Sequence, residues 1–248
     1  MIVSDDAIIL NSRKYGETSK LLRIFTRTGG KISAIAKGAR KNKNKFQSSL
    51  DPLSYSKVSY YHKSQRDLQL LSAAELIEPL RKIHESFDHL SLGLILAESV
   101  DMALASDEEN QELFELMLEG LRALNELHED PYPIFALFQF ELAKMLGFEI
   151  NAERKNINEL DKSYFLLDKG EFSEGRPGSM TYAFAADLDF YKAIHDIANS
   201  SFADVCKIEL NQKLKQQIYN FFIRYFSYHM ERRYSFRSFD LFRENMGL

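Results

Sequence analysis

The first 75 residues or so alternate between hydrophobic and polar positions with the period of two that is typical of β-strands. Residues 20–26 place Leu22 and Ile24 on one face, and residues 31–37 repeat the pattern with Ile32 and Ala34. The connecting Arg-Thr-Gly-Gly has the composition of a tight turn, because glycine tolerates positive φ. We therefore expect a β-hairpin. Three further candidate strands, at 6–12, 52–62 and 67–74, complete the five strands of a small antiparallel barrel.

From Pro79 onward the hydrophobic period lengthens to that of amphipathic helices. Helices are predicted at 90–104, 112–127, 134–146, 188–198 and 210–231. The segment 151–180 is the least regular, with several Gly and Pro residues around one short strand candidate at 164–167. The pattern predicts an α+β multidomain protein. A β-barrel domain over 1–78 is followed by an all-α domain over 79–248, which carries a small irregular insertion at 151–182.

The composition narrows the class of protein. The 248 residues are 45% hydrophobic and 12% aromatic, which is enough apolar surface for a packed core and too much for a disordered chain. No apolar run approaches the roughly 18 residues that a membrane span needs, and the first residues lack the pattern of a secretory signal. Cys206 is the single cysteine, which excludes an internal disulfide and a multi-cysteine zinc site. These features predict a cytoplasmic, globular protein without a membrane segment.

The net charge of −4 hides a strong asymmetry along the chain. Residues 11–66 carry 14 basic and 2 acidic side chains, whereas residues 81–130 carry 3 basic and 13 acidic ones. Residues 207–243 turn basic again, with 8 against 3. One interpretation is an N-terminal module that faces a polyanion. The other is a basic domain that docks on an acidic one, and charge alone leaves both open.

Signals for catalysis are weak. The sequence contains no nucleophile elbow, phosphate-binding glycine loop or dinucleotide fingerprint. Its histidines show no i,i+4 pairing of the kind that holds a metal ion on one helix face. We therefore expect no catalytic residues, no metal and no cofactor, and a protein that is not an enzyme.

The predicted hairpin carries the strongest candidate site. Its outer face interleaves cations with one aromatic ring, a combination that suits single-stranded nucleic acid because cations neutralise phosphates and a ring stacks on a base. A cationic loop follows the second strand of the hairpin. The candidate DNA-binding residues are Arg23, Phe25, Arg27, Lys31, Lys37, Arg40, Lys41, Lys43 and Lys45. The alternatives are a merely solvated strand face with a flexible loop, and a DNA site on the C-terminal helix around Arg224, Arg232 and Arg233.

Four blocks stand out in the first 40 residues: 7–10 (AIIL), 15–19 (YGETS), 25–26 with 30–31 (FT and GK), and 36–40 (AKGAR). Their order and spacing resemble the opening of the RecO family of bacterial recombination mediators. Weaker similarity extends over the chain at 50–52 (LDP), 71–75, 146–148 (LGF) and 237–239 (RSF). The resemblance implies an N-terminal OB-fold and a helical C-terminal domain. One departure is that many members carry a four-cysteine zinc element after the Leu-Gly block, whereas 151–180 here contains no cysteine.

The same resemblance implies a function in DNA repair: binding single- and double-stranded DNA, annealing strands, and helping RecA replace the single-stranded DNA-binding protein. The implied partners are RecR and the acidic, apolar C-terminal tail of that binding protein. Such a tail needs apolar contacts and a cation. We expect its site at the helix 134–146, with Lys144 or the basic stretch 207–243 supplying the cation. The alternative function is a helical adaptor whose barrel serves as a docking module.

Overall fold

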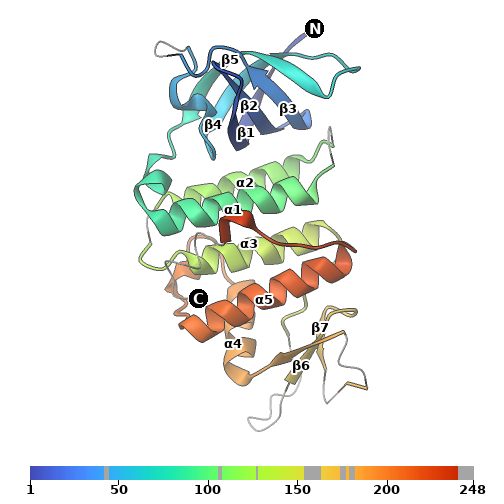
Figure 1. The fold of residues 1–248 in the computed structure, drawn as a ribbon. Coiled ribbons are helices and arrows are strands. Elements are labelled where there is room, and N and C mark those ends of the chain that lie inside the picture. The colour runs from blue at the N-terminus through green and yellow to red at the C-terminus, as the bar shows by residue number, and fades with distance from the viewer. Residues whose placement is uncertain are drawn as a thin grey trace. The chain divides into compact units, whose positions relative to one another are not determined.

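The computed structural model describes residues 1–41, 45–105, 108–126, 128–153, 163–173, 177–178 and 182–239 (Figure 1). The chain forms two compact units, Met1–Leu127 and His128–Leu248. Both units contain helices and strands.

The first unit begins with a closed five-stranded barrel of order β1-β2-β3-β5-β4. Its strands are β1 (Ile2–Tyr15), β2 (Ser19–Thr26), β3 (Gly30–Ala36), β4 (Tyr55–Tyr61) and β5 (Leu68–Glu78), and the 3₁₀ turn η1 (Gln47–Leu50) links β3 to β4. The barrel and its β2–β3 hairpin confirm the prediction. The prediction of a wholly antiparallel barrel is wrong, because β3 and β5 pair in parallel. Alternation shows which face a side chain occupies, and it carries no information about the direction of the neighbouring strand.

The interior of the barrel holds the side chains that the alternation selects. Leu22, Ile24, Ile32, Ala34 and Ala36 all belong to its buried core. An irregularity between Ile9 and Asn11 shifts the pairing of β1 with β2. This bulge lets the long strand β1 bend around the barrel and pair with β4 as well.

The first unit also contains the helices α1 (Phe87–Ala103) and α2 (Gln111–Leu124), preceded by the 3₁₀ turn η2 (Arg81–Glu85). Figure 1 shows α1 and α2 lying next to one another against one end of the barrel. Leu53, with φ +68°, packs against α1, so close to Gly93 that a Cβ there would lie 2.6 Å from the Leu53 side chain. The barrel ends at Glu78. The compact unit extends beyond the predicted domain boundary at 78/79, so that boundary stays a prediction.

The described part of the second unit combines three helices with a small sheet. The helices are α3 (Tyr132–Met145), α4 (Leu188–Ala198) and α5 (Gln212–His229), and the 3₁₀ turn η3 (Val205–Lys207) precedes α5. The strands β6 (Ser163–Leu166), β7 (Glu171–Ser173) and β8 (Ala183–Ala186) form a sheet of order β7-β6-β8. The sequence predicted only the first of these strands. Strands of three or four residues are too short for a period of two to become visible.

Aromatic rings dominate the core of the second unit. Phe165 of β6 meets Phe221 and Tyr225 of α5 at ring-centroid distances of 4.9 and 5.8 Å. The Tyr225 hydroxyl donates to the carbonyl oxygen of Phe148 over 3.0 Å, and burial raises the pKa of this tyrosine. Burial lowers the pKa of His229, whose ring stacks on Phe148 at 4.7 Å. The sheet and α5 therefore share one apolar core.

Candidate nucleic-acid interface

The helices α1 and α2 of the same unit cover the part of the β2–β3 hairpin's outer face that carries Phe25, Arg27 and Lys31. Phe25 has 0% exposed surface, and its ring lies 5.4 Å from that of Phe114 on α2. Tyr55 of β4 contacts the same Phe114 ring at 6.1 Å. The expectation that Phe25 is exposed to stack on a base is wrong. Alternation correctly directs this side chain out of the barrel, where a helix buries it.

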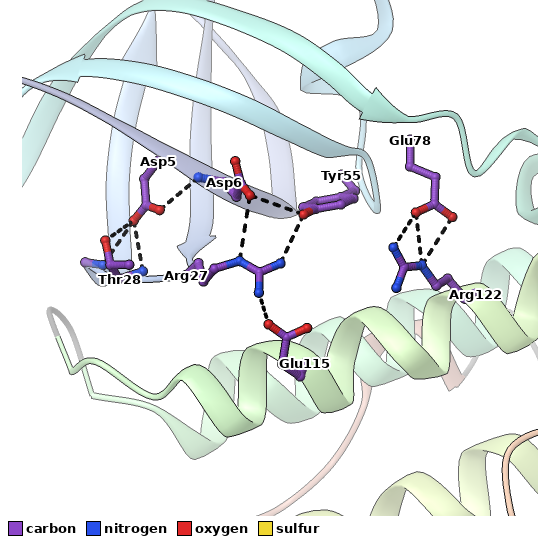
Figure 2. Close-up of polar contacts among 9 residues, drawn as sticks. Asp5, Asp6, Arg27, Thr28, Tyr55, Glu78, Glu115 and Arg122 are labelled. Carbon is purple, nitrogen blue, oxygen red and sulfur yellow. Dashed lines mark hydrogen bonds and ion pairs between the residues drawn. The ribbon is translucent and has the colours of Figure 1, made fainter.

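Arg27 also faces the helices, as Figure 2 shows. Its guanidinium pairs with Glu115 of α2, donates to the Tyr55 hydroxyl over 3.1 Å and lies 3.7 Å from the Asp6 carboxylate. The same group sits 4.7 Å above the centre of the Phe114 ring, a cation–π arrangement. Arg27 thus joins β1, β4 and α2.

Lys31 is buried, with 5% exposed surface, at the C-terminal end of α1. Its ammonium lies 3.1 Å from the Asp101 carboxylate and donates to the carbonyl oxygens of Asp101 and Leu104, the latter over 2.5 Å. A cation is favourable here because the last carbonyls of a helix carry partial negative charge. Arg23 donates to Ser33 over 3.2 Å and reaches the same Asp101 carboxylate at 3.4 Å. The expectation that Lys31 is exposed is wrong, for the same reason as at Phe25.

These contacts decide between the two interpretations of the charge asymmetry for this part of the barrel. Arg23, Arg27 and Lys31 are partners of acidic groups on α1 and α2, so the basic strand face docks on the acidic helices. A further ion pair joins the end of β5 to α2, where Arg122 donates to Glu78 over 2.6 and 3.0 Å (Figure 2). This hydrogen bonding raises the pKa of Arg122.

The turn between β2 and β3 is held by a carboxylate of β1. Asp5 accepts hydrogen bonds from the Thr28 amide and hydroxyl, over 2.9 and 2.8 Å, and from the Gly29 amide over 3.2 Å (Figure 2). Only 7% of Asp5 is exposed. Side-chain acceptors of this kind satisfy turn amides that the strand ladder leaves unpaired.

Glycine is required at position 30 of this turn, because the backbone has a positive φ and no room is left for a Cβ. Its φ is +68°, and a Cβ would lie 2.4 Å from the backbone oxygen of Glu108. We expect Gly30→Ala to lose at least the roughly 1–2 kcal/mol of a left-handed non-glycine residue, and more from the clash. Gly16 is the matched control, because its φ is +57° and a Cβ added there would meet nothing within 4 Å. Urea unfolding should show a clearly larger loss for Gly30→Ala than for Gly16→Ala, and equal losses would contradict the close approach of Glu108.

The helices leave part of the barrel's outer face uncovered, at the end formed by the β1–β2 turn. Arg13 pairs with Leu21 across the sheet, and Leu21 pairs with Ile35, so these three side chains share one face. Tyr15 and Lys37 continue this face by the same alternation, and both are exposed. We call this surface the outer strip: Arg13, Tyr15, Leu21, Ile35 and Lys37.

The loop after β3 adds cations to the edge of the outer strip. Arg40 is exposed, and its guanidinium donates to the carbonyl oxygens of Gly16 and Glu17, each over 3.0 Å. The backbone amide of Arg40 donates to the carbonyl oxygen of Thr18 over 2.9 Å. The two sequence blocks YGETS and AKGAR are therefore in direct contact, with Arg40 fixing the β1–β2 turn beside the strip.

The three remaining loop residues predicted to bind DNA are Lys41, Lys43 and Lys45. Lys41 is exposed, whereas Lys43 lies outside the described residues. Lys45 is exposed too, donates to the carbonyl oxygen of Ser72, and lies 5.1 Å over the Phe46 ring. The DNA-binding role of each of these residues stays a prediction. Sequence reasoning missed Arg13 and Tyr15, although the unbroken run of polar and cationic residues at the end of the first strand was a signal for them.

Neither a metal centre nor a membrane span is found among the described residues. Within those ranges, no group of three or more His, Cys, Asp or Glu side chains is placed to hold a metal ion. In the same part of the chain, no helix combines the length and apolar character needed to cross a membrane.

The strand order of the barrel defines the class of fold to which the first unit belongs. A closed barrel with this strand order is an OB-type barrel, and the β2–β3 face and β1–β2 loop are where OB-folds take oligonucleotides. Comparison with known proteins narrows the class. The family model described as "Recombination protein O N terminal" matches residues 1–80, and that described as "Recombination protein O C terminal" matches residues 84–237. The chain belongs to the RecO family of DNA repair proteins.

Similar proteins come from diverse bacteria and carry the name DNA repair protein RecO. That of Salinibacter ruber is 28% identical over 221 residues, which cover 88% of this chain and 84% of the relative. That of Chloroherpeton thalassium is 27% identical over 257 residues, covering 98% and 99%. That of Heliobacterium modesticaldum is 36% identical over 142 residues, covering 57% and 50%.

Proposed function

We propose that the chain is a DNA-binding recombination mediator that binds and anneals single-stranded DNA and helps RecA replace the single-stranded DNA-binding protein. Membership in a family of DNA repair proteins supports the general assignment. The observation that carries the DNA-binding site is the outer strip, which places exposed cations beside an exposed aromatic ring.

The chemistry of the outer strip matches single-stranded DNA. Tyr15 is 48% exposed, so its ring is accessible to a base, while Arg13 and Lys37 flank it on the same face. Leu21 and Ile35, which follow Arg13 across the sheet, are half-buried and supply an apolar floor. Base stacking on such rings tolerates any sequence, and cations follow the backbone.

Annealing by this mechanism needs no covalent step. Cations lower the repulsion between the phosphates of two strands, which lets complementary bases meet. We therefore propose a protein that is not an enzyme and uses neither a metal nor a bound cofactor. The proposed partners are single- and double-stranded DNA, RecR and the acidic tail of the single-stranded DNA-binding protein.

The proposed site for that tail is the C-terminal end of α3. This helix is buried along most of its length, and Lys144 and Met145 are exposed at its end. Met145 is 37% exposed and offers an apolar contact, and the preceding residue, Lys144, offers a cation. An apolar peptide with a terminal carboxylate needs this pair of contacts.

The salt dependence of binding tests the outer strip. Each phosphate neutralised on a single strand contributes about 0.7 to the slope of log K against log salt. The variant Arg13→Gln/Lys37→Gln/Lys41→Gln should flatten that slope by about 2 and weaken binding to all sequences alike. Fluorescence anisotropy with a labelled oligonucleotide across a salt series measures both quantities.

Lys57 provides the control, because it is exposed on β4, a strand that does not contribute to the outer strip. Lys57→Gln should leave the slope unchanged, whereas Lys37→Gln alone should lower it by about 0.7. An unchanged slope in the folded triple variant would place DNA elsewhere. Absence of annealing between labelled complementary strands by the wild-type protein would favour the adaptor function instead.

A further inference from the structure

Two exposed tyrosines and an arginine meet on the surface of the second unit. Tyr182 is 49% exposed and Tyr228 is 37% exposed, and their ring centroids lie 5.5 Å apart. Arg224 stands one helical turn before Tyr228 on α5 and donates to the carbonyl oxygen of Ala183 over 3.1 Å. This bond brings Arg224 next to the segment that carries Tyr182. We call Tyr182, Arg224 and Tyr228 the aromatic patch.

The aromatic patch is not part of the hydrophobic core. On α5 the core is formed by the neighbouring aromatic residues Phe221, Phe222, Tyr225 and Phe226, all of which have 0% exposed surface. Tyr182 and Tyr228 instead keep large ring areas in water. Exposed aromatic rings that lie in contact with one another and beside a guanidinium mark a surface for recognition rather than for packing.

The charges around the aromatic patch favour an anionic partner. α5 contains Lys213, Lys215 and Arg224 and no Asp or Glu, and Arg232 and Arg233 follow its end. Lys213 and Lys215 already have carboxylate partners, Asp187 at 2.6 Å and Asp130 at 2.9 Å. Within five residues of Tyr228 along the chain, three arginines, Arg224, Arg232 and Arg233, stand against one carboxylate, Glu231.

We propose that the aromatic patch is a second binding site for single-stranded DNA. Tyr182 and Tyr228 stack on bases, and Arg224 and the cations that follow α5 contact the phosphates. The proposal rests on the function proposed above and deepens it, since the outer strip holds one strand and the aromatic patch holds the other. A chain with two such sites brings two strands together without a partner protein.

Binding stoichiometry with the full chain tests the proposal. An oligothymidine of about ten nucleotides is short enough to occupy one site, since single sites of this kind span roughly 4–16 nucleotides. The wild-type chain should bind two such oligonucleotides, and Tyr182→Ala/Tyr228→Ala should bind one. Annealing of labelled complementary strands by the variant should slow about tenfold or more, as expected for the loss of a stacked base.

Phe87→Ala is the matched control, because Phe87 is 46% exposed but lies in the acidic segment of the first unit. It should keep two sites and the wild-type annealing rate. A wild-type chain that anneals strands while binding a single oligonucleotide would overturn the second site and leave the proposed function standing. Two sites and unchanged annealing in the double variant would also overturn it. A wild-type chain that binds no DNA would overturn both proposals.

Discussion

Replacing Phe25 by alanine is expected to destabilise the first unit by about 3–5 kcal/mol, the usual cost of truncating a fully buried phenylalanine. The side chain has no exposed surface, and its ring packs edge-on against Phe114 at 5.4 Å. Truncation leaves a cavity between the barrel and α2, beside the Arg27 guanidinium that lies over the same Phe114 ring. Urea unfolding of the full chain, followed through the transition of the first unit, measures the loss.

Tyr15→Ala is the counterpart, because Tyr15 is exposed on the outer strip. It should change stability by no more than about 0.5 kcal/mol. Its affinity for single-stranded DNA should fall by about 5-fold to 150-fold, which corresponds to the loss of one stacked base at 1–3 kcal/mol. The folded Phe25→Ala protein should bind DNA like the wild type. The opposite result would be weaker DNA binding by Phe25→Ala, with neither stability nor DNA affinity changed by Tyr15→Ala. That result would place the DNA-binding site on the face of the hairpin that carries Phe25.

The barrel was predictable from the sequence because its interior imposes a strict period of two. Leu22, Ile24, Ile32 and Ala34 all lie inside, as the alternation requires. The sequence could not show what lies against the other face. A row of Arg, Phe and Lys side chains has the same pattern whether it faces water, DNA or an acidic helix. The choice depends on Glu115 and Asp101, which are distant in sequence and become neighbours only in the folded chain.

The candidate site was predictable only in part, for a similar reason. Lys37 and Arg40 follow the second strand of the hairpin, β3, and are exposed, as expected for a cationic loop. The contact of Arg40 with the carbonyl oxygens of Gly16 and Glu17 needs the closed barrel and has no sequence signal of its own. The aromatic patch is still less visible. Along the chain, β8, α4 and nearly all of α5 lie between Tyr182 and Tyr228. Other aromatic residues of α5 fill the core, so the sequence does not show which of them are exposed.

Lys31→Met is expected to destabilise the first unit by about 2–4 kcal/mol. The substitution keeps an apolar side chain of similar length and removes the ammonium. It leaves the Asp101 carboxylate and the last carbonyl oxygens of α1 without this donor, in a place where only 6% of the lysine side chain reaches solvent. Removing one partner of a buried pair costs about 3–5 kcal/mol, and the 38% exposure of the Asp101 side chain lowers this cost. Adding Asp101→Asn should recover part of the loss, which a double-mutant cycle by urea unfolding measures.

The same substitution six residues further along provides the control. Lys37 follows β3 on the same face as Lys31 but is exposed, so Lys37→Met should change stability by no more than about 0.5 kcal/mol. Binding to single-stranded DNA should respond in the opposite way. The salt slope should fall by about 0.7 for Lys37→Met and stay unchanged for folded Lys31→Met, because only the first lysine is accessible to a phosphate. An unaltered stability together with a lowered slope for Lys31→Met would mean that α1 leaves the barrel when DNA binds.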